Sequence, residues 1–149
     1  MTLKQQIYTH YLHLINDKVN LLQQNLADLK EAGANETKST AGDKHETALA
    51  MLQIEQANKR DQLKGMQLQK TALEKIDPAI VATIIVNGSL VKTNKGYFFV
   101  STALGKAIVN EIAVIAVSPA SPLGAKLTGL RVGDTAIMNN TVYDIESIE

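Results

Sequence analysis

The chain has 149 residues, 45% of them hydrophobic and 20% charged, a composition that is typical of a folded soluble protein and excludes disorder throughout. Its fifteen basic and fifteen acidic residues give a formal net charge of zero, which excludes the broad positive surface expected of a protein that binds free nucleic acid. Cysteine is absent, so disulfides, thiolate nucleophiles and cysteine-ligated zinc are excluded and a reducing cytoplasm is favoured, and no stretch approaches the ~20 apolar residues that cross a bilayer.

The first predicted element is a long helix from about Leu3 to Ala32. Its apolar residues alternate spacings of four and three, which is the heptad pattern of a coiled coil. These residues are Tyr8, Leu12, Ile15, Val19, Leu22, Leu26 and Leu29. A helix of this extent is roughly 45 Å long, more than the core of a small domain requires. The pattern therefore predicts an extended arm.

Residues 33–42 are small and polar with a glycine at each end, which predicts a reversal of the chain. A second helix is predicted from about Lys44 to Ile76, with less regular apolar spacing, and Asp77-Pro78 ends it because proline disfavours a helical residue before it. We therefore predict an antiparallel coiled-coil arm over residues 1–77, with its tip at about 33–46, and a second domain over 78–149.

Beyond Pro78 the apolar period becomes that of extended strands. Residues 81–86 and 89–93 are expected to pair as a hairpin around Asn87-Gly88, residues 97–101 and 112–117 to form further strands, and residues 135–138 and 141–145 to form a second hairpin. Ser121, Pro122 and Gly129 have the chemistry of the cap, first position and end of a short helix. The predicted fold class is α+β, a two-helix coiled coil followed by a twisted antiparallel sheet with one short helix.

Asp43 and Glu46 stand three residues apart at the start of the second helix, so both project from one face. Two carboxylates at an exposed end could share Mg²⁺ with a partner, because Mg²⁺ takes one or two protein carboxylates and fills the rest of its shell with other oxygens. The alternative is a capping box, in which the same two side chains satisfy free amides at the helix start. The two roles are compatible.

The stretch Gly42-Asp43-x-x-Glu46-x-Ala48 resembles the tip motif of the Gre family of bacterial transcript-cleavage factors, of the GreA and GreB type. A second match is more specific. The run Ser118-Pro119-Ala120-Ser121-Pro122-Leu123-Gly124, continued by Leu127-x-Gly129 and Val132-Gly133-Asp134, is similar to the family's Ser-Pro-Leu-Gly, Leu-x-Gly and Val-Gly-Asp run. The family's architecture is an N-terminal antiparallel coiled coil and an FKBP-like α+β domain, which agrees with the predicted elements.

The resemblance implies that the C-terminal domain docks at the rim of the secondary channel of bacterial RNA polymerase while the arm enters the channel. It assigns partner binding to the loop residues Ser118, Pro119, Ser121, Pro122, Leu123 and Gly124. Asp43 and Glu46 would be the catalytic pair, helping to hold a second Mg²⁺ at the polymerase's active centre and to position a water that cuts backtracked RNA near its 3′ end. The chain would then be a cytoplasmic monomer that is not itself an enzyme and has no cofactor of its own.

Two departures from the family pattern keep other functions open. The family usually continues after the glutamate with Asn-Ala-Glu-Tyr, whereas this chain has Thr47-Ala48-Leu49-Ala50, and Ala120 replaces a residue that is often acidic. A regulator that occupies the channel without promoting cleavage is therefore the first alternative. Two others are a coiled-coil adapter whose arm dimerises and a peptidyl-prolyl isomerase. The isomerase needs an aromatic-lined pocket, whereas the aromatic residues Tyr97, Phe98, Phe99 and Tyr143 are expected in the sheet core.

Overall fold

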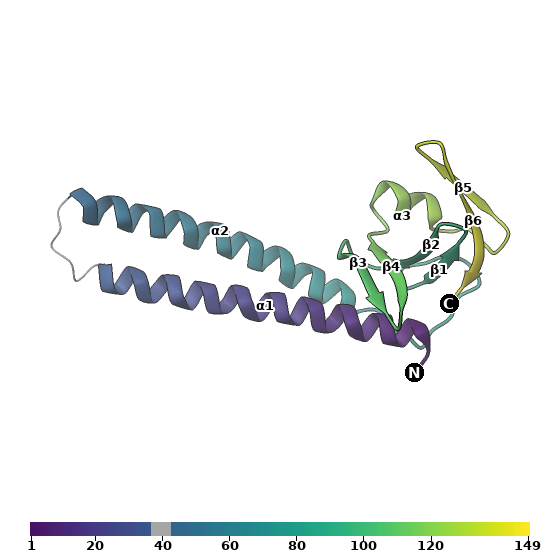
Figure 1. The fold of residues 1–149 in the computed structure, drawn as a ribbon, viewed down its shortest axis with the longest axis horizontal. Helices are drawn as coiled ribbons and strands as arrows, with labels where there is room; N and C mark the ends of the chain where they lie inside the picture. The colour runs from purple at the N-terminus through teal and green to yellow at the C-terminus, as the bar shows by residue number, and fades with distance from the viewer. Residues whose placement is uncertain (37–42) are drawn as a thin grey trace. The chain divides into compact units, whose positions relative to one another are not determined.

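The structure is a computed structural model that describes the backbone of residues 1–36 and 43–149 and the side chains outside 36–45. Residues 37–42 of the predicted turn, its second part, lie outside the described residues. Within the described ranges, two long helices, α1 (Leu3–Glu36) and α2 (Asp43–Glu74), precede six strands and the short helix α3 (Pro122–Leu127) (Figure 1). The chain divides into two compact units, Leu14–Lys70 and Met1–His13 with Thr71–Glu149. The division into domains 1–77 and 78–149 stays a prediction.

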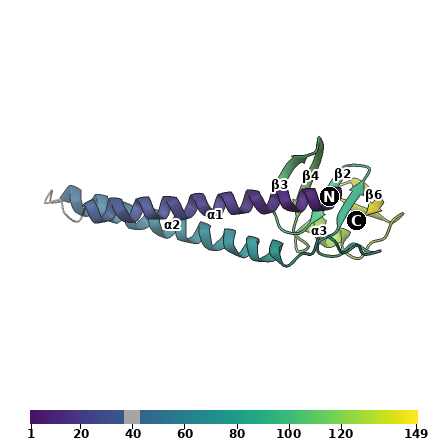
Figure 2. The same ribbon diagram turned by 90° about the horizontal axis from the view of Figure 1, so that it is seen from below.

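In the unit Leu14–Lys70 the two helices run antiparallel, side by side (Figures 1 and 2). From α1, Ile15, Val19 and Leu22 are buried, as the heptad pattern predicts. The half-buried residues of α2 include a series that also alternates spacings of three and four. This series is Leu49, Leu52, Gln56, Lys59, Leu63 and Met66. The apolar residues of α2 alone are irregularly spaced because polar side chains occupy two positions of this seam.

In the first turns of α1, the buried residues lie one position before the residues that the heptad pattern predicts to be buried. Ile7 and Tyr11 are fully buried, whereas the predicted Tyr8 and Leu12 are only half-buried. The reason is that this part of α1 packs against the sheet, where the Tyr11 ring stacks on Phe99 with ring centroids 6.2 Å apart. A different partner therefore selects a different face of the same helix.

The strands are β1 (Leu90–Thr93), β2 (Gly96–Val100), β3 (Gly105–Val109), β4 (Ile112–Val117), β5 (Thr135–Met138) and β6 (Thr141–Ile148). They form a sheet in the order β3-β4-β2-β1-β6-β5. The prediction of a wholly antiparallel sheet is wrong, because β2 and β4 pair in parallel, with Phe98 opposite Ile115. The cause is β3, which the sequence pattern did not predict. A turn at Asn110 and Glu111, both at positive φ, joins β3 to the antiparallel β4. Because of this extra strand, β4 runs in the same direction as β2.

The predicted hairpin between residues 81–86 and 89–93 is also wrong. Residues 81–86 form no strand, and only Ile84 makes an isolated bridge, to Arg131. The backbone of Ile85 instead pairs with the segment after α3, accepting from the Gly129 amide at 2.7 Å and donating to the Leu130 carbonyl at 2.8 Å. The turn at Asn87-Gly88 does form, with Gly88 at φ 96°. Residues 81–86, which precede this turn, do not pair with 89–93 because Ile85 packs in the core beneath α3.

The second predicted hairpin is confirmed, with Asn139 and Asn140 both at positive φ between β5 and β6. The helix α3 is confirmed as well. One face of the sheet and α3 share a buried cluster of Ile85, Val91, Phe98, Val100, Leu123, Leu127, Ala136 and Ile145. The opposite face carries Phe99, which meets Tyr11 of α1. The fold is therefore α+β, with a mixed sheet whose two faces are covered by different helices.

Over residues 1–36 and 43–149, no helix combines the length and the apolar character that spanning a membrane requires.

Candidate functional site

The loop that joins β4 to α3 is held by its own serines. The Ser121 hydroxyl donates to the Ser118 carbonyl at 2.6 Å and accepts from the Gly124 amide at 3.1 Å. The Ser118 hydroxyl accepts from the Ala120 amide at 3.1 Å. Ser121 is therefore the N-cap that the sequence predicts, and both serines use their hydroxyl groups to shape the loop.

Gly124 is required by the closeness of this loop to the first turn of α3. A Cβ atom placed on Gly124 would lie 1.9 Å from the Ser118 carbonyl oxygen, a distance no side chain can occupy. The carbonyl of Gly124 also accepts a 2.7 Å hydrogen bond from the Thr128 hydroxyl. Because Gly124 has no side chain, the loop can fold back on the first turn of α3. Its amide and carbonyl are hydrogen-bonded to Ser121 and Thr128.

The loop residues differ in what they offer to a partner. Leu123 and Gly124 are buried, and Leu123 belongs to the core beneath α3. Ser118, Pro119 and Ser121 are half-buried, whereas Pro122 is exposed, as is Ala120. The exposed residues of the loop are therefore Ala120 and Pro122, and the hydrogen bonds of the two serines hold this part of the chain in place.

The tip residues are placed by the start of α2. The helix begins at Asp43, so Asp43 and Glu46 both fall in its first turn, where the partial positive charge of a helix N-terminus favours carboxylates. The Glu46 side chain is exposed. The side chain of Asp43 lies outside the described part, so the capping box and the shared Mg²⁺ both stay predictions. Among the described residues, no three His, Cys, Asp or Glu side chains gather into a possible metal site.

One charged residue of α1 that the sequence patterns did not single out, Lys4, is buried in the unit that joins Met1–His13 to Thr71–Glu149. The Lys4 side chain is only 3% exposed, and its Nζ donates to the Ile80 carbonyl at 2.6 Å. Burial lowers the pKa of Lys4, against the opposing effect of Glu149 and Asp77. Lys4, Ile7 and Tyr11 are spaced by three and four, but each lies one position before the predicted heptad positions, so the heptad pattern did not identify them.

Together, the helical hairpin, the mixed α+β unit and the self-bonded loop define a protein of two parts, a pair of long helices and a small domain with a proline-bearing surface loop. No protein-family model matches the chain, and no curated protein matches it significantly. Two solved structures do match it. One, described as the transcription factor Gfh1, is 15% identical, with 92% of each chain covered and a TM-score of 0.37.

The other is GreA factor homolog 1 (Gfh1) of Thermus thermophilus, which is 18% identical over 88% of this chain and 94% of that one, with a TM-score of 0.34. These are proteins that the chain is similar to along nearly its whole length.

Proposed function

We propose that this protein is a transcription elongation factor of the Gre type, which binds bacterial RNA polymerase at its secondary channel and stimulates cleavage of backtracked RNA. The observation that carries the proposal is the position of the two motifs in the fold. Asp43 and Glu46 fall in the first turn of α2, where the hairpin reverses, and the Ser118–Gly124 run forms a surface loop on the other unit. Each motif of the resemblance contains exposed residues, Glu46 in the first and Ala120 and Pro122 in the second.

In this proposal the Ser118–Gly124 loop binds the rim of the channel, and the helical hairpin places the Asp43 and Glu46 carboxylates inside it. The exposed Ala120 and Pro122 present an apolar surface to the rim of the channel, and the hydrogen bonds of the serines fix its shape before binding. The carboxylates of Asp43 and Glu46 would help to hold a Mg²⁺ that the polymerase supplies. When bound there, the ion would supply a more acidic water for attack on the RNA phosphodiester. The chain contributes ligands and position, and the nuclease activity belongs to the polymerase.

The residues after Glu46 support a second candidate, a regulator that occupies the channel without promoting cleavage. Leu49 stands where the Gre pattern has an acidic residue, and here it is half-buried in the α2 seam. A tip that has lost one carboxylate holds Mg²⁺ less well, because affinity for this ion follows the number of charged oxygen ligands. Docking is common to the two candidates, and only cleavage separates them.

The remaining alternatives find less support. Phe98 and Phe99 are buried in the sheet core, so these aromatic residues do not provide the lining that a peptidyl-prolyl isomerase needs. A dimeric coiled-coil adapter predicts a dimer in sedimentation, whereas the proposed factor acts as a cytoplasmic monomer.

The test is a pull-down against purified bacterial RNA polymerase, followed by a cleavage assay on a stalled elongation complex with and without Mg²⁺. The parent chain is expected to bind and to release a short RNA carrying the 3′ end only with Mg²⁺. The double variant Asp43→Ala, Glu46→Ala should bind equally well and release none. Binding without cleavage by the parent would favour the channel-occupying regulator, and no binding would end both proposals.

A further inference from the structure

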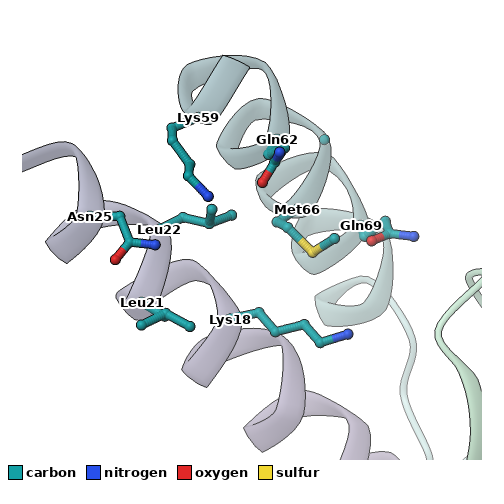
Figure 3. A pocket seen from close by; sticks show the side chains of 9 residues that line it. Lys18, Leu21, Leu22, Asn25, Lys59, Gln62, Met66 and Gln69 are labelled. Carbon is teal, nitrogen blue, oxygen red and sulfur yellow. The ribbon is translucent and has the colours of Figure 1, made fainter. Parts of the chain in front are cut away.

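A groove of about 690 Å³ runs along one side of the hairpin, between α1 and α2 (Figure 3). Leu22 from α1 and Met66 from α2 line it, and Leu21 stands beside them with 62% of its side chain exposed. All of these residues belong to the unit Leu14–Lys70, so the groove is a property of the hairpin itself. An apolar surface of this kind in water is a candidate contact surface.

Gly65 in the groove wall has no packing reason to be glycine. It lies in the middle of α2, where glycine is the least favourable residue other than proline. A Cβ atom added to it would have no neighbour within 4 Å, and its backbone needs no left-handed conformation. What glycine does provide is an open backbone surface, which another helix can approach closely. This points to something outside the chain that uses the space.

The charges around the groove identify the chemistry of that occupant. Lys18 and Lys59 line it, one from each helix, and none of its described lining residues is acidic. Met66 adds a flexible apolar side chain that adapts to varied surfaces. An apolar groove between two helices with a cation on each wall is complementary to a third helix that carries carboxylates beside an apolar stripe.

We propose that this groove receives an amphipathic, acidic α-helix of the partner protein, which crosses the hairpin at Gly65. The inference rests on the proposed function in taking bacterial RNA polymerase as that partner. It adds a second contact, on the side of the hairpin, to the docking loop and the tip. Its occupant is a protein helix and neither RNA nor a second copy of this chain.

The test measures binding of the full chain to purified RNA polymerase, with a matched pair of variants. Leu21 and Leu68 are 62% and 64% exposed, and only Leu21 lines the groove. Leu21→Gln should weaken binding about tenfold and Leu68→Gln should leave it unchanged, because only the first loses a desolvated contact. The pair Lys18→Glu, Lys59→Glu should weaken binding further, with a smaller loss at high salt.

Gly65→Ala separates docking from stability. It should raise the melting temperature, because alanine favours a helix, and yet weaken polymerase binding about tenfold, because its methyl group keeps the partner helix away. If Gly65 has no role in docking, only the rise in melting temperature should be seen. A photoreactive amino acid in place of Gln62, which also lines the groove, should cross-link to a polymerase segment that is helical and acidic.

The outcomes separate the two proposals. If the parent chain does not bind polymerase, the proposed function and this inference both fall. If it binds and Leu21→Gln and Gly65→Ala bind as tightly, the groove is unused and only this inference is overturned. Cross-links to RNA, or a parental dimer that Leu21→Gln disperses in sedimentation, would also overturn it, because they assign the groove to another occupant.

Discussion

The hydroxyl group of Tyr11 donates a 2.7 Å hydrogen bond to the backbone carbonyl of Gly105, the first residue of β3. A longer contact of 3.3 Å joins the same hydroxyl to the carbonyl of Val114 in β4. Tyr11 is fully buried, so one proton serves two carbonyls where water does not reach. The start of α1 is in this way joined to the edge of the sheet within one compact unit.

Removing this hydroxyl should destabilise the protein. Tyr11→Phe keeps the ring that stacks on Phe99 and leaves the Gly105 carbonyl without its donor, which should lower the free energy of unfolding by about 1–2 kcal/mol. Urea unfolding measures the change. Tyr8→Phe is the control, since Tyr8 lies one turn earlier, is only half-buried and should change stability by less than about 0.5 kcal/mol. Equal losses for the two variants would contradict the role given to the Tyr11 hydroxyl.

The same tyrosine should make stability fall at high pH. Burial raises the pKa of Tyr11 to about 12, whereas the pKa of tyrosine in an unfolded chain is about 10. Below pH ~10 both states keep the proton and the contribution is complete; above it the unfolded state ionises first, so stability is lost as pH rises toward 12. Urea midpoints at pH 8, 10 and 11 should decline more steeply for the parent than for Tyr11→Phe. Parallel profiles would show that other groups cause the decline.

Two glycine substitutions should have opposite effects on stability. Gly124→Ala places a Cβ atom 1.9 Å from the Ser118 carbonyl, and should cost roughly 3 kcal/mol and release the loop from α3. Gly65→Ala meets nothing and should add about 1 kcal/mol through helix propensity. Thermal unfolding and amide hydrogen exchange at residues 118–128 measure both effects. A Gly124→Ala protein as stable as the parent would mean that the loop can move away from the helix at little cost.

Amide substitutions at the tip should separate the capping role from metal binding. Asn is as good a helix cap as Asp, and Gln serves in a capping box as Glu does. Asp43→Asn with Glu46→Gln should therefore leave helicity and polymerase binding unchanged while removing the charges that attract Mg²⁺. The expected result is a loss of RNA cleavage on the order of 100-fold, comparable to the loss of one catalytic group. Unchanged cleavage would leave these two residues with the capping role alone.

Most of the candidate site was predicted from the sequence, because its motifs are short and continuous. The loop from Ser118 to Gly124 and the pair Asp43 and Glu46 can be read from consecutive residues. The groove could not be predicted in this way, since it combines Leu21 and Leu22 with Gly65 and Met66 from the other helix. Its one signal was Gly65 within a helical pattern, and a single glycine does not say what lies opposite.

The sequence by itself determined the features whose causes lie within a few residues of one another. The long α1, the Ser121 cap of α3 and the Asn139-Asn140 hairpin are of this kind, because capping bonds, turn geometry and helical periodicity act locally. Only the tertiary structure decided which segments meet: that Ile85 pairs beneath α3, that β4 returns parallel to β2, and that Tyr11 is buried in place of Tyr8. These choices minimise exposed apolar surface and unpaired backbone groups over the whole unit, a condition that no local pattern expresses.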